Sequence, residues 1–396
     1  MNSKTLLVLA ASRYQVPIIV QAKQLGLRVI TTDNVPDNPG HILADRAYGV
    51  DTTDMKGVLN IARKEHINGV IAACTDVALP TAAYVSEKLG MRCMPFQSTQ
   101  ICCDKVSFRS FLKSLLLPVP EVYTFSKDTE PPHNIFSSQW VMKPARSSGS
   151  KGVFVVSSFK EFYSHRRETL SYSLSGNGIL ETFIDGSQGT CEGVIQNGKV
   201  VWHIVTDRQT APQPYAATHG HCVPSRITED KSSKLIGKIE KLLTNLDIID
   251  SVFDCDFICT RDSIYIIEIS PRLGGNSMTT LIRHACGFDI IDYAVRLACE
   301  LPTSMPDQNK SIAPTALVLL GVMKEGSLKY DDAGAKSLRL EPWVHGLEID
   351  RKPNEIVYPF INGRFRIGEA IISADSRDDL DLRIIDLKAR LNLRVQ

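Results

Sequence analysis

The sequence predicts an α/β protein built from two different parts. Up to residue 96, apolar strand-like runs alternate with helix-like segments, which is typical of a doubly wound parallel sheet. Beyond that point, strand-like runs follow one another and are joined by short turns, which indicates antiparallel sheets and an α+β arrangement. The 396 residues suffice for two or three domains with substantial cores.

In the first part we expect strands at 4–11, 28–33, 44–51 and 69–74, and helices at 16–26, 55–66 and 78–90. Such a sheet usually binds its ligand at the carboxyl ends of the strands. Asp33 ends the second strand, as in NAD-binding domains. The first turn, AASRYQ, has no glycine, however, and the pyrophosphate of NAD needs the close backbone approach that glycine permits. The sequence therefore disfavours an NAD-dependent oxidoreductase.

Composition excludes several other classes of protein. The formal charge is only +1, so no broad field attracts nucleic acid or an anionic membrane. No apolar run approaches the length of a membrane span, and the short apolar run after the N-terminus fits a buried strand better than a signal peptide. Ten cysteines without a C-x-x-C pair suggest free thiols in a reducing cytoplasm.

The second part opens with a helix and a hairpin. We expect helices at 105–116, 232–246, 291–300 and 378–391, and strands at 139–145, 153–158, 178–185, 190–207 (turning at Asn197-Gly198), 252–260, 263–270, 315–323 and 368–374. The hairpin loop, SSGSKG, follows a strand that carries Lys143. Backbone N–H groups and hydroxyls in such a loop can cover phosphate oxygens while the lysine supplies charge. The alternative is an exposed hairpin with a solvated lysine.

Two acids on consecutive expected strands form the second candidate site. Antiparallel pairing through the turn TRDS would put Asp256 and Glu268 on one face, together with Asp254. Two carboxylates with open positions for water and phosphate suit Mg²⁺. Isoleucines flank Glu268, and a buried carboxylate needs a metal or a cation such as Arg272. The alternative is a pair of surface acids on a half-exposed sheet.

Other motifs carry less chemistry. HGHC at 219–222 invites a zinc interpretation, but no fourth ligand is evident nearby. Ser/His/Asp catalysis has no G-x-S-x-G elbow to support it.

Several motifs in order resemble one superfamily. DKVSFRSFL, WVMKPARSSGSKGV, ILETFIDGSQGTCEG and DCDF with YIIEISPRLGG resemble the ATP-grasp superfamily, in particular its carboxylate–amine ligases. The resemblance implies an ATP-grasp fold with a small C-terminal antiparallel sheet. It divides the chain into an N-terminal Rossmann-like domain (1–97), an ATP-grasp domain (98–300, with a lid at 118–185 and a metal and substrate part at 186–300) and a C-terminal part (301–396).

The resemblance also implies a nucleotide site. ATP would be held through its phosphates by Lys105 and Lys143 and covered by a flexible loop, while the adenine and ribose are met at the following hinge. The residues implied for the loop are Ser147, Ser148, Gly149, Ser150 and Gly152, and those implied for the hinge are Glu181, Phe183, Ile184 and Gln188.

Asp256 and Glu268 match the ligands of Mg²⁺ (or Mn²⁺), with Ser270 as a weak ligand where asparagine is usual. Arg272 matches the arginine that binds the substrate carboxylate or its acyl phosphate. The implied activity is an ADP-forming ligase that couples a carboxylate to an amine; the alternative is an ATP-binding protein without turnover. Expected partners are small-molecule substrates, with a homodimer as an option. Beyond Arg272, the pocket is expected near Glu192, Asp207, Arg208, His219–His221, Gly274 and Gly275.

Overall fold

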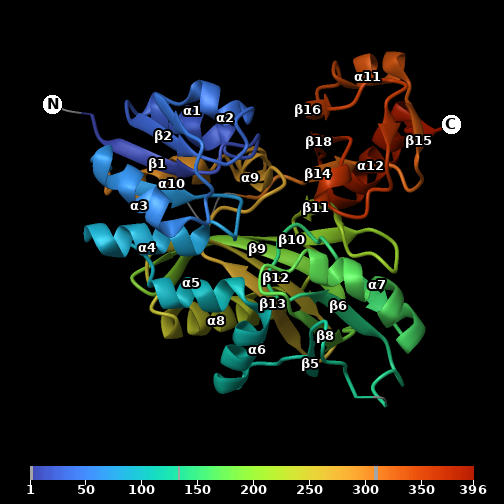
Figure 1. The fold of residues 1–396 in the computed structure, drawn as a ribbon. Helices are drawn as coiled ribbons and strands as arrows, with labels where there is room; N and C mark the ends of the chain where they lie inside the picture. The colour runs from blue at the N-terminus through green and yellow to red at the C-terminus, as the bar shows by residue number, and fades with distance from the viewer. Residues whose placement is uncertain (1–2, 133, 307–310) are drawn as a thin grey trace.

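The computed structural model describes residues 3–132, 134–306 and 311–396. The N-terminal part lies beside a long antiparallel sheet, and the C-terminal part lies at the far end of that sheet (Figure 1). A small separate sheet, β5-β8-β6-β7, carries the expected hairpin. Within the described residues, no helix is both long and apolar enough to cross a membrane.

The N-terminal sheet is parallel, in the order β3-β2-β1-β4, as predicted. Alternate residues of β1 point to opposite faces, so one face packs on α1 and α10 and the other on α3 and α4. The elements of this part are β1 (Thr5–Leu9), α1 (Val16–Gln24), β2 (Arg28–Thr32), α2 (Pro39–Leu43), β3 (Arg46–Tyr48), α3 (Met55–Lys64), β4 (Gly69–Ala72) and α4 (Leu79–Leu89). The helix α10 (Ile290–Ala298) returns from much later in the chain to cover the sheet.

Asp33 has a structural role in this part. Its buried carboxylate accepts hydrogen bonds from the backbone N–H groups of Ala11 (2.8 Å) and Val35 (2.9 Å). The acid thus fixes the first turn onto the segment after β2.

Eight antiparallel strands form the central sheet, in the order β13-β12-β9-β10-β11-β14-β18-β16. Asn197 and Gly198 both have positive φ angles at the β9–β10 turn, which glycine and asparagine tolerate. The bounds are β9 (Ser187–Gln196), β10 (Lys199–Thr210), β11 (Thr218–Val223), β12 (Ser251–Cys259), β13 (Ile264–Ser270), β14 (Thr315–Leu320), β16 (Val344–Ile349) and β18 (Gly368–Ser373).

Helices cover one face of the central sheet along β9, β12 and β13. Phe253, Cys255 and Phe257 of β12 pack with α8 (Glu229–Asn245) and α6 (Lys105–Ser114) in one hydrophobic cluster. Two further helices, α5 (Phe96–Cys103) and α9 (Met278–Cys286), also contact this sheet. Because strand side chains alternate, the residues between these apolar ones face the opposite way.

The small sheet is β5 (Val122–Phe125), β8 (Gly178–Thr182), β6 (Trp140–Pro144) and β7 (Phe154–Val156), with α7 (Phe159–Ser171) packed against it. β6 and β7 pair antiparallel, which confirms the predicted hairpin around the Gly-Ser loop.

The C-terminal part is continuous with the central sheet. β14, β18 and β16 extend it, while α11 (Asp332–Leu338) and α12 (Arg377–Leu391) pack on one face. A small antiparallel sheet joins β17 (Ile356–Val357), β15 (Gly326–Lys329) and β19 (Arg394–Val395), and a short 3₁₀ turn, η1 (Gly363–Phe365), precedes β18. The predicted small C-terminal sheet is therefore present.

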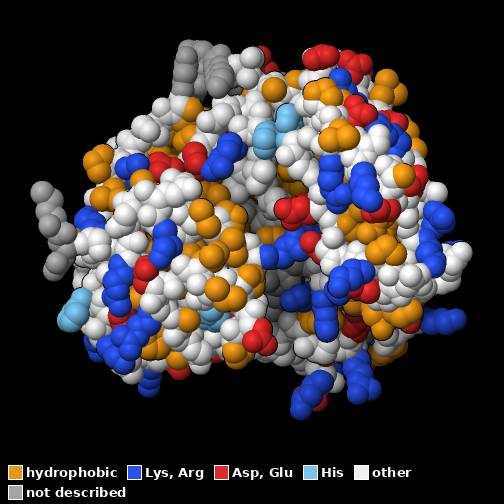
Figure 2. All heavy atoms as spheres, turned by 90° about the horizontal axis from the view of Figure 1, so that it is seen from above, with side chains coloured by type: hydrophobic (Ala, Val, Ile, Leu, Met, Phe, Trp, Pro, Cys, Tyr) orange, Lys and Arg blue, Asp and Glu red, His pale blue; other side chains and the backbone are white. Residues whose placement is uncertain are grey.

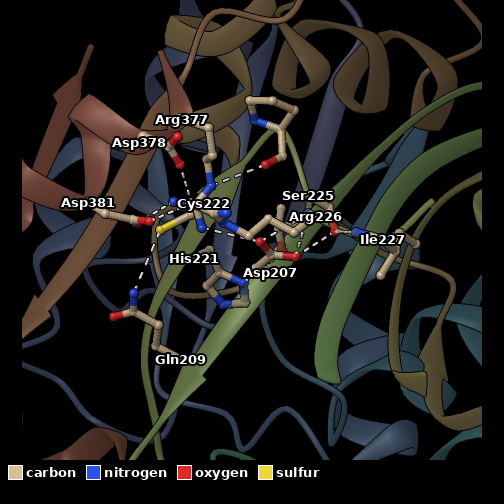
Figure 3. Close-up of polar contacts among 12 residues, drawn as sticks. Asp207, Gln209, His221, Cys222, Ser225, Arg226, Ile227, Arg377, Asp378 and Asp381 are labelled. Carbon is tan, nitrogen blue, oxygen red and sulfur yellow. Dashed lines mark hydrogen bonds and ion pairs between the residues drawn. The ribbon is translucent and has the colours of Figure 1, made fainter. Parts of the chain in front are cut away.

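Asp207 joins α12 to the sheet. Its carboxylate accepts hydrogen bonds from Ser225 Oγ (2.6 Å) and Arg377 Nη2 (3.2 Å), and Arg377 also pairs with Asp381 (Figure 3). The sequence-based expectation that Asp207 borders the pocket is wrong. Arg208, its neighbour, faces the cavity, so alternation along β10 turns Asp207 to the other face.

Candidate functional site

One large cavity, of ≈ 750 Å³, lies between the small sheet and the central sheet. Tyr14, from the turn after β1, and Phe360, from the C-terminal part, also line it. Seen from above, the molecule has a hollow at its middle, with Lys and Arg side chains along its edge (Figure 2). Three parts of the chain therefore contribute to one site.

The floor of the cavity is formed by β9, β12 and β13, and two rows of aligned side chains run across these strands. Strand register places Thr190 opposite Asp256 and Asp256 opposite Glu268; we name these three residues the outer row. Register likewise aligns Glu192, Asp254 and Ser270, which we name the inner row. The predicted common face of Asp254, Asp256 and Glu268 is confirmed, since all three line the cavity.

Each acid of the outer row has a cation as its neighbour. Asp256 Oδ2 lies 2.6 Å from Arg208 Nη1, and Asp256 Oδ1 accepts a hydrogen bond from Thr190 Oγ1 (2.7 Å). Glu268 Oε2 lies 3.3 Å from Lys105 Nζ. Both carboxylates keep 30% of their side-chain surface exposed, so they remain open to the cavity.

The wall opposite the floor carries Lys143 on β6. Its Nζ lies 2.6 Å from Glu181 Oε2 of β8, and Arg109 Nε of α6 lies 2.7 Å from Glu181 Oε1. Burial lowers the pKa of Lys143 to about 8, although the Glu181 carboxylate favours the charged amine. Burial also disfavours the charge of Glu181, but Arg109 and Lys143 outweigh it and hold its pKa at about 2. Two cations thus share one carboxylate.

The Gly-Ser loop lies between this wall and the C-terminal part. Gly149 and Gly152 have positive φ angles, which glycine adopts without strain. Ser150, between them, also has a positive φ angle, which is strained for a residue with a side chain. Lys105 Nζ donates to the Ser147 carbonyl (3.4 Å), and Gly363 N–H donates to the Gly149 carbonyl (3.5 Å). Lys105 itself is the first residue of α6, which the Asp104 side chain caps.

Arg272 lies beside the inner row and pairs with Asp254 of that row. Its Nε and Nη2 donate to Asp76 Oδ1 (2.9 and 2.6 Å), and its Nη1 donates to Asp254 Oδ2 (2.7 Å). Ser270 Oγ donates to the same Asp76 oxygen (2.7 Å). Burial raises the pKa of Asp254 to about 6, even though Arg272 favours its ionised form.

Glu192 lies behind this group and does not line the cavity. It is 1% exposed, and its Oε1 has no hydrogen-bond partner among the described residues. Its other oxygen accepts a long hydrogen bond from Gly274 N–H (3.4 Å). Burial, together with the adjacent Asp254 carboxylate, raises the pKa of Glu192 well above its usual range.

Gly274 is required by this packing. A Cβ at Gly274 would lie 1.7 Å from Glu192 Oε1 and 3.0 Å from Asp254 Oδ2, which is far inside contact distance. A Cβ at Gly275, in contrast, would meet nothing within 4 Å.

The structure brings most of the sequence-predicted residues to the cavity. Those that line it are Lys105, Lys143, Ser147, Ser148, Gly149, Ser150, Glu181, Phe183, Ile184, Gln188, Arg208, Asp256, Glu268, Ser270, Arg272 and Gly275. Gly152, Glu192, His219 and Gly274 do not line it. His219 stacks on Phe360 with ring centroids 4.6 Å apart. His221 does line the cavity, as expected, and its Nδ1 is 3.0 Å from Thr206 Oγ1.

The sequence analysis did not identify two residues that hold charged side chains of the site in place. Asp76, which fixes Arg272, comes from the N-terminal part just after β4, and an acid at the carboxyl end of a parallel strand is the signal that could have identified it. Arg109 lies one helical turn after Lys105 on α6, and this i, i+4 spacing places both on one face of the helix.

Asp256 and Glu268 fit a magnesium ion by the chemistry of their donors. Two hard oxygen ligands face each other on adjacent strands, and both are open to a cavity in which water and phosphate oxygens can supply the remaining ligands. Within the described part of the chain, no group of three or more His, Cys, Asp or Glu side chains could hold a metal by itself.

Two antiparallel sheets face each other across the cavity, one bearing Lys143 and the other the paired carboxylates, and this arrangement suits a phosphate ligand with its metal ion. Residues 102–276 match the family model described as the ATP-grasp domain. This part of the chain is therefore identified as an ATP-grasp domain.

Individual proteins show the same similarity at low sequence identity. Formate-dependent phosphoribosylglycinamide formyltransferase of Chlorobaculum tepidum is 23% identical, over 96% of this chain and 94% of that protein. The solved structure of an L-amino acid ligase from Bacillus licheniformis has a TM-score of 0.83 and 20% identity, with all of both chains covered. That of phosphoribosylglycinamide synthetase from Anaerococcus prevotii has a TM-score of 0.77 and 19% identity, also over all of both chains.

Proposed function

We propose that this protein is an ATP-dependent, ADP-forming ligase that joins a carboxylate to an amine through an acyl phosphate. The observation that carries the proposal is the cavity itself, which places Lys143 and the Gly-Ser loop opposite the Asp256–Glu268 pair and Arg272 beside them. The named relatives, a formyltransferase, an amino-acid ligase and a synthetase, support the same class of reaction.

The reaction needs activation because a carboxylate resists attack by amines. A carboxylate oxygen attacks the γ-phosphorus of ATP, the bond to ADP breaks, and an acyl phosphate forms. The amine nitrogen then attacks the acyl carbon, phosphate leaves with the bonding electrons, and the nitrogen loses a proton. Such phosphoryl transfer depends mainly on positioning and on neutralising charge.

The residues of this chain have distinct parts in that scheme. Lys143 and Lys105 approach the cavity from two elements and would neutralise the triphosphate. The backbone N–H groups of the loop at 147–152 would cover it and exclude water. Arg272, held from both sides by Asp76 and Asp254, would bind the carboxylate and then its acyl phosphate. Asp256 and Glu268 would hold magnesium, which when bound neutralises phosphate charge.

The adenine is expected at the hinge that follows β8. Phe183 and Ile184 line the cavity directly after this strand, as does Gln188 at the start of β9. Glu181 is already paired with Lys143 and Arg109, so we assign its carboxylate to orienting the lysine and the adenine contacts to the residues after it.

The test is ADP formation from Mg-ATP with the purified full chain and a panel of amino acids and other small carboxylic acids, each paired with amines. Wild-type protein should release ADP with at least one pair, and Lys143→Ala should lower turnover by about 10²–10³, the scale for loss of one preorganised charge. Saturable Mg-ATP binding with no ADP formed from any pair would instead favour a nucleotide-binding protein without turnover.

A further inference from the structure

Most of the cations that line the cavity are already paired with a carboxylate. The paired ones are Lys105, Lys143, Arg208, Arg272 and Arg366. Two others, Lys151 and Arg364, have no ion pair among the described residues. Lys151 belongs to the Gly-Ser loop, which would cover the triphosphate. Arg364 lies outside that loop, in the turn η1 of the C-terminal part, and offers its charge to another part of the ligands.

The backbone of the turn that carries Arg364 is anchored at the cavity. Asn362, which is 4% exposed, accepts a hydrogen bond from Arg364 N–H through its Oδ1 (3.0 Å). Between these two residues, Gly363 N–H donates to the Gly149 carbonyl of the Gly-Ser loop (3.5 Å). The side chain of Arg364 therefore starts from a fixed position, although it has no partner of its own among the described residues.

The ion pairs beside this turn balance one another without Arg364. Arg366, whose side chain is 3% exposed, pairs with Glu369 and with Asp350 (3.4 Å). Asp350 also pairs with Arg13, from the turn after β1. Two guanidinium groups therefore meet two carboxylates, and the charge of Arg364 is left over.

Two polar side chains lie around the same ion pairs. The guanidinium carbon of Arg366 lies 5.7 Å from the centroid of the Tyr14 ring. Asn276 directly precedes the serine whose Oγ donates to Glu369 (2.7 Å). Both line the cavity, and neither the Tyr14 hydroxyl nor the Asn276 side-chain amide is hydrogen-bonded to a described residue. We name Tyr14, Asn276 and Arg364 the open polar cluster.

We propose that the open polar cluster binds a substrate carboxylate other than the one that reacts, and that Arg364 determines this specificity. The proposal rests on the proposed function, in which Arg272 binds the reacting carboxylate. Asn276 follows Arg272 on the segment after β13, so the cluster extends the site of acyl phosphate formation. The substrate class is thus a dicarboxylic acid, or an amine that carries a carboxylate, as an amino acid does.

The cluster suits a carboxylate better than a phosphate. A guanidinium group can donate two parallel hydrogen bonds to a carboxylate, and the amide and hydroxyl groups can donate to its remaining lone pairs. The single charge of Arg364 neutralises one carboxylate. A phosphate dianion would leave an excess negative charge close to Asp350 and Glu369, whose cations are already shared.

The test compares pairs of probes that differ in one carboxylate. For the acid, succinate and glutarate are compared with their monoamides; for the amine, glycine and β-alanine are compared with glycinamide and β-alaninamide. Inorganic phosphate is a further probe. The melting temperature of the full chain would be measured with Mg²⁺ and a non-hydrolysable ATP analogue, and potassium chloride would equalise the ionic strength.

In at least one pair, the probe with the additional carboxylate should raise the melting temperature of the wild type in a saturable manner. We expect its affinity to exceed that of its amide by about tenfold or more. A preference among the acid probes would identify a dicarboxylic acid as the substrate, and a preference among the amine probes would identify an amine that carries a carboxylate.

Arg364→Met removes the charge and keeps a long side chain. We expect its affinity for the preferred probe to fall by about tenfold or more, with affinity for the ATP analogue within about twofold of wild type. Arg364→Lys should retain part of the affinity, because lysine keeps the charge but not the two parallel hydrogen bonds. Arg261→Met, at an exposed arginine outside the cavity, is the matched control and should bind every probe like the wild type.

Asn276→Asp keeps the proposal testable if Arg364→Met fails to fold. Asn276 has a positive φ angle, which aspartate also tolerates, so the substitution changes the charge without straining the backbone. The added carboxylate would repel the carboxylate of the probe, and we expect the affinity to fall by about tenfold or more.

No preference for the additional carboxylate in any pair would overturn the proposal. So would unchanged affinity in Arg364→Met, or in Asn276→Asp if Arg364→Met does not fold. Binding of inorganic phosphate that depends on Arg364 and is tighter than that of every carboxylate probe would overturn it in favour of a phosphate site. A carboxylate preference that depends on Arg364 without any ADP formation would contradict the ligase function and still support the carboxylate site.

Discussion

The outer and inner rows lie on the same strands, but their acids differ in exposure and in how they are paired with cations. In the outer row, Asp256 and Glu268 are partly exposed and each has one cation beside it. In the inner row, Asp254 shares Arg272 with Asp76, and Glu192 is buried with an unpartnered oxygen. The two rows are only two residues apart along β9 and β12. The acids of the outer row are open to exchange of their cation, whereas those of the inner row are buried around Arg272.

This difference suggests different uses. An exposed acid can exchange its lysine or arginine for a metal ion at small cost, because water solvates the carboxylate during the exchange. A buried guanidinium held by two carboxylates cannot be released so easily, since each partner would be left as an unpaired buried charge. The outer row therefore suits ligands that come and go, and the inner row suits fixed orientation.

Breaking the inner row should have the largest effect on stability. Arg272→Met leaves Asp76 and Asp254 without their cation, and we expect the free energy of unfolding to fall by about 3–5 kcal/mol. Chemical denaturation monitored by circular dichroism measures this free energy of unfolding. Lys336→Met removes an exposed pair with Asp332 and should leave stability unchanged. An equal effect of the two substitutions would show that the inner row is not preassembled.

Breaking the outer row should affect turnover and leave folding intact. Glu268→Ala removes a half-open carboxylate, so we expect ADP formation to fall by about 10²–10³ with no loss of melting temperature. Lys105 would also lose its partner, which adds to the excess of positive charge around the phosphates. Turnover close to wild type would remove Glu268 from the metal site.

The adjacent glycines sharpen the comparison further. Gly274→Ala forces its Cβ against Glu192 and Asp254, and we expect a loss of about 1–3 kcal/mol in the free energy of unfolding, as for other overpacked sites. Gly275→Ala meets nothing within 4 Å and serves as the matched control for stability. Indistinguishable unfolding curves for the two variants would argue against the close packing of the inner row.

The smallest effect should come from pH, acting on the wall that faces both rows. Lys143 must be charged to hold phosphate, and its pKa of about 8 lies below the usual value of 10.5. The charged form is present below pH 8 and is lost as the pH rises through that value. The apparent kcat/KM should therefore decline above pH 8, and Lys143→Arg should move this decline to higher pH. A profile that is flat to pH 9 in the wild type would contradict the assignment.

Much of this arrangement could be predicted from the sequence because it follows local rules. Alternation along a strand gives the common face of Asp254 and Asp256, and the hairpin turn at Asn197-Gly198 fixes the register of β9 and β10. Motif order gave the superfamily, which the family model confirms for residues 102–276.

The rest depends on contacts between distant segments. Asp76 and Arg272 are 196 residues apart in the chain, and nothing local to either signals that they pair. The resemblance implies that Glu181 contacts the adenine. In the structure, however, Arg109 of α6 and Lys143 both pair with its carboxylate. The error for Asp207 arose because the pocket was inferred as a stretch of sequence, whereas β10 exposes only every second residue to the cavity.

The lysine wall and the carboxylate floor belong to separate sheets, whereas β14, β18 and β16 continue the floor without interruption. A rigid-body rotation of the smaller sheet would widen the cavity and move Lys143 away from Asp256 and Glu268. No hydrogen bond between strands of either sheet would have to break. The C-terminal strands would stay with the central sheet. Ligands could therefore enter and leave while Arg272 kept its ion pairs with Asp76 and Asp254.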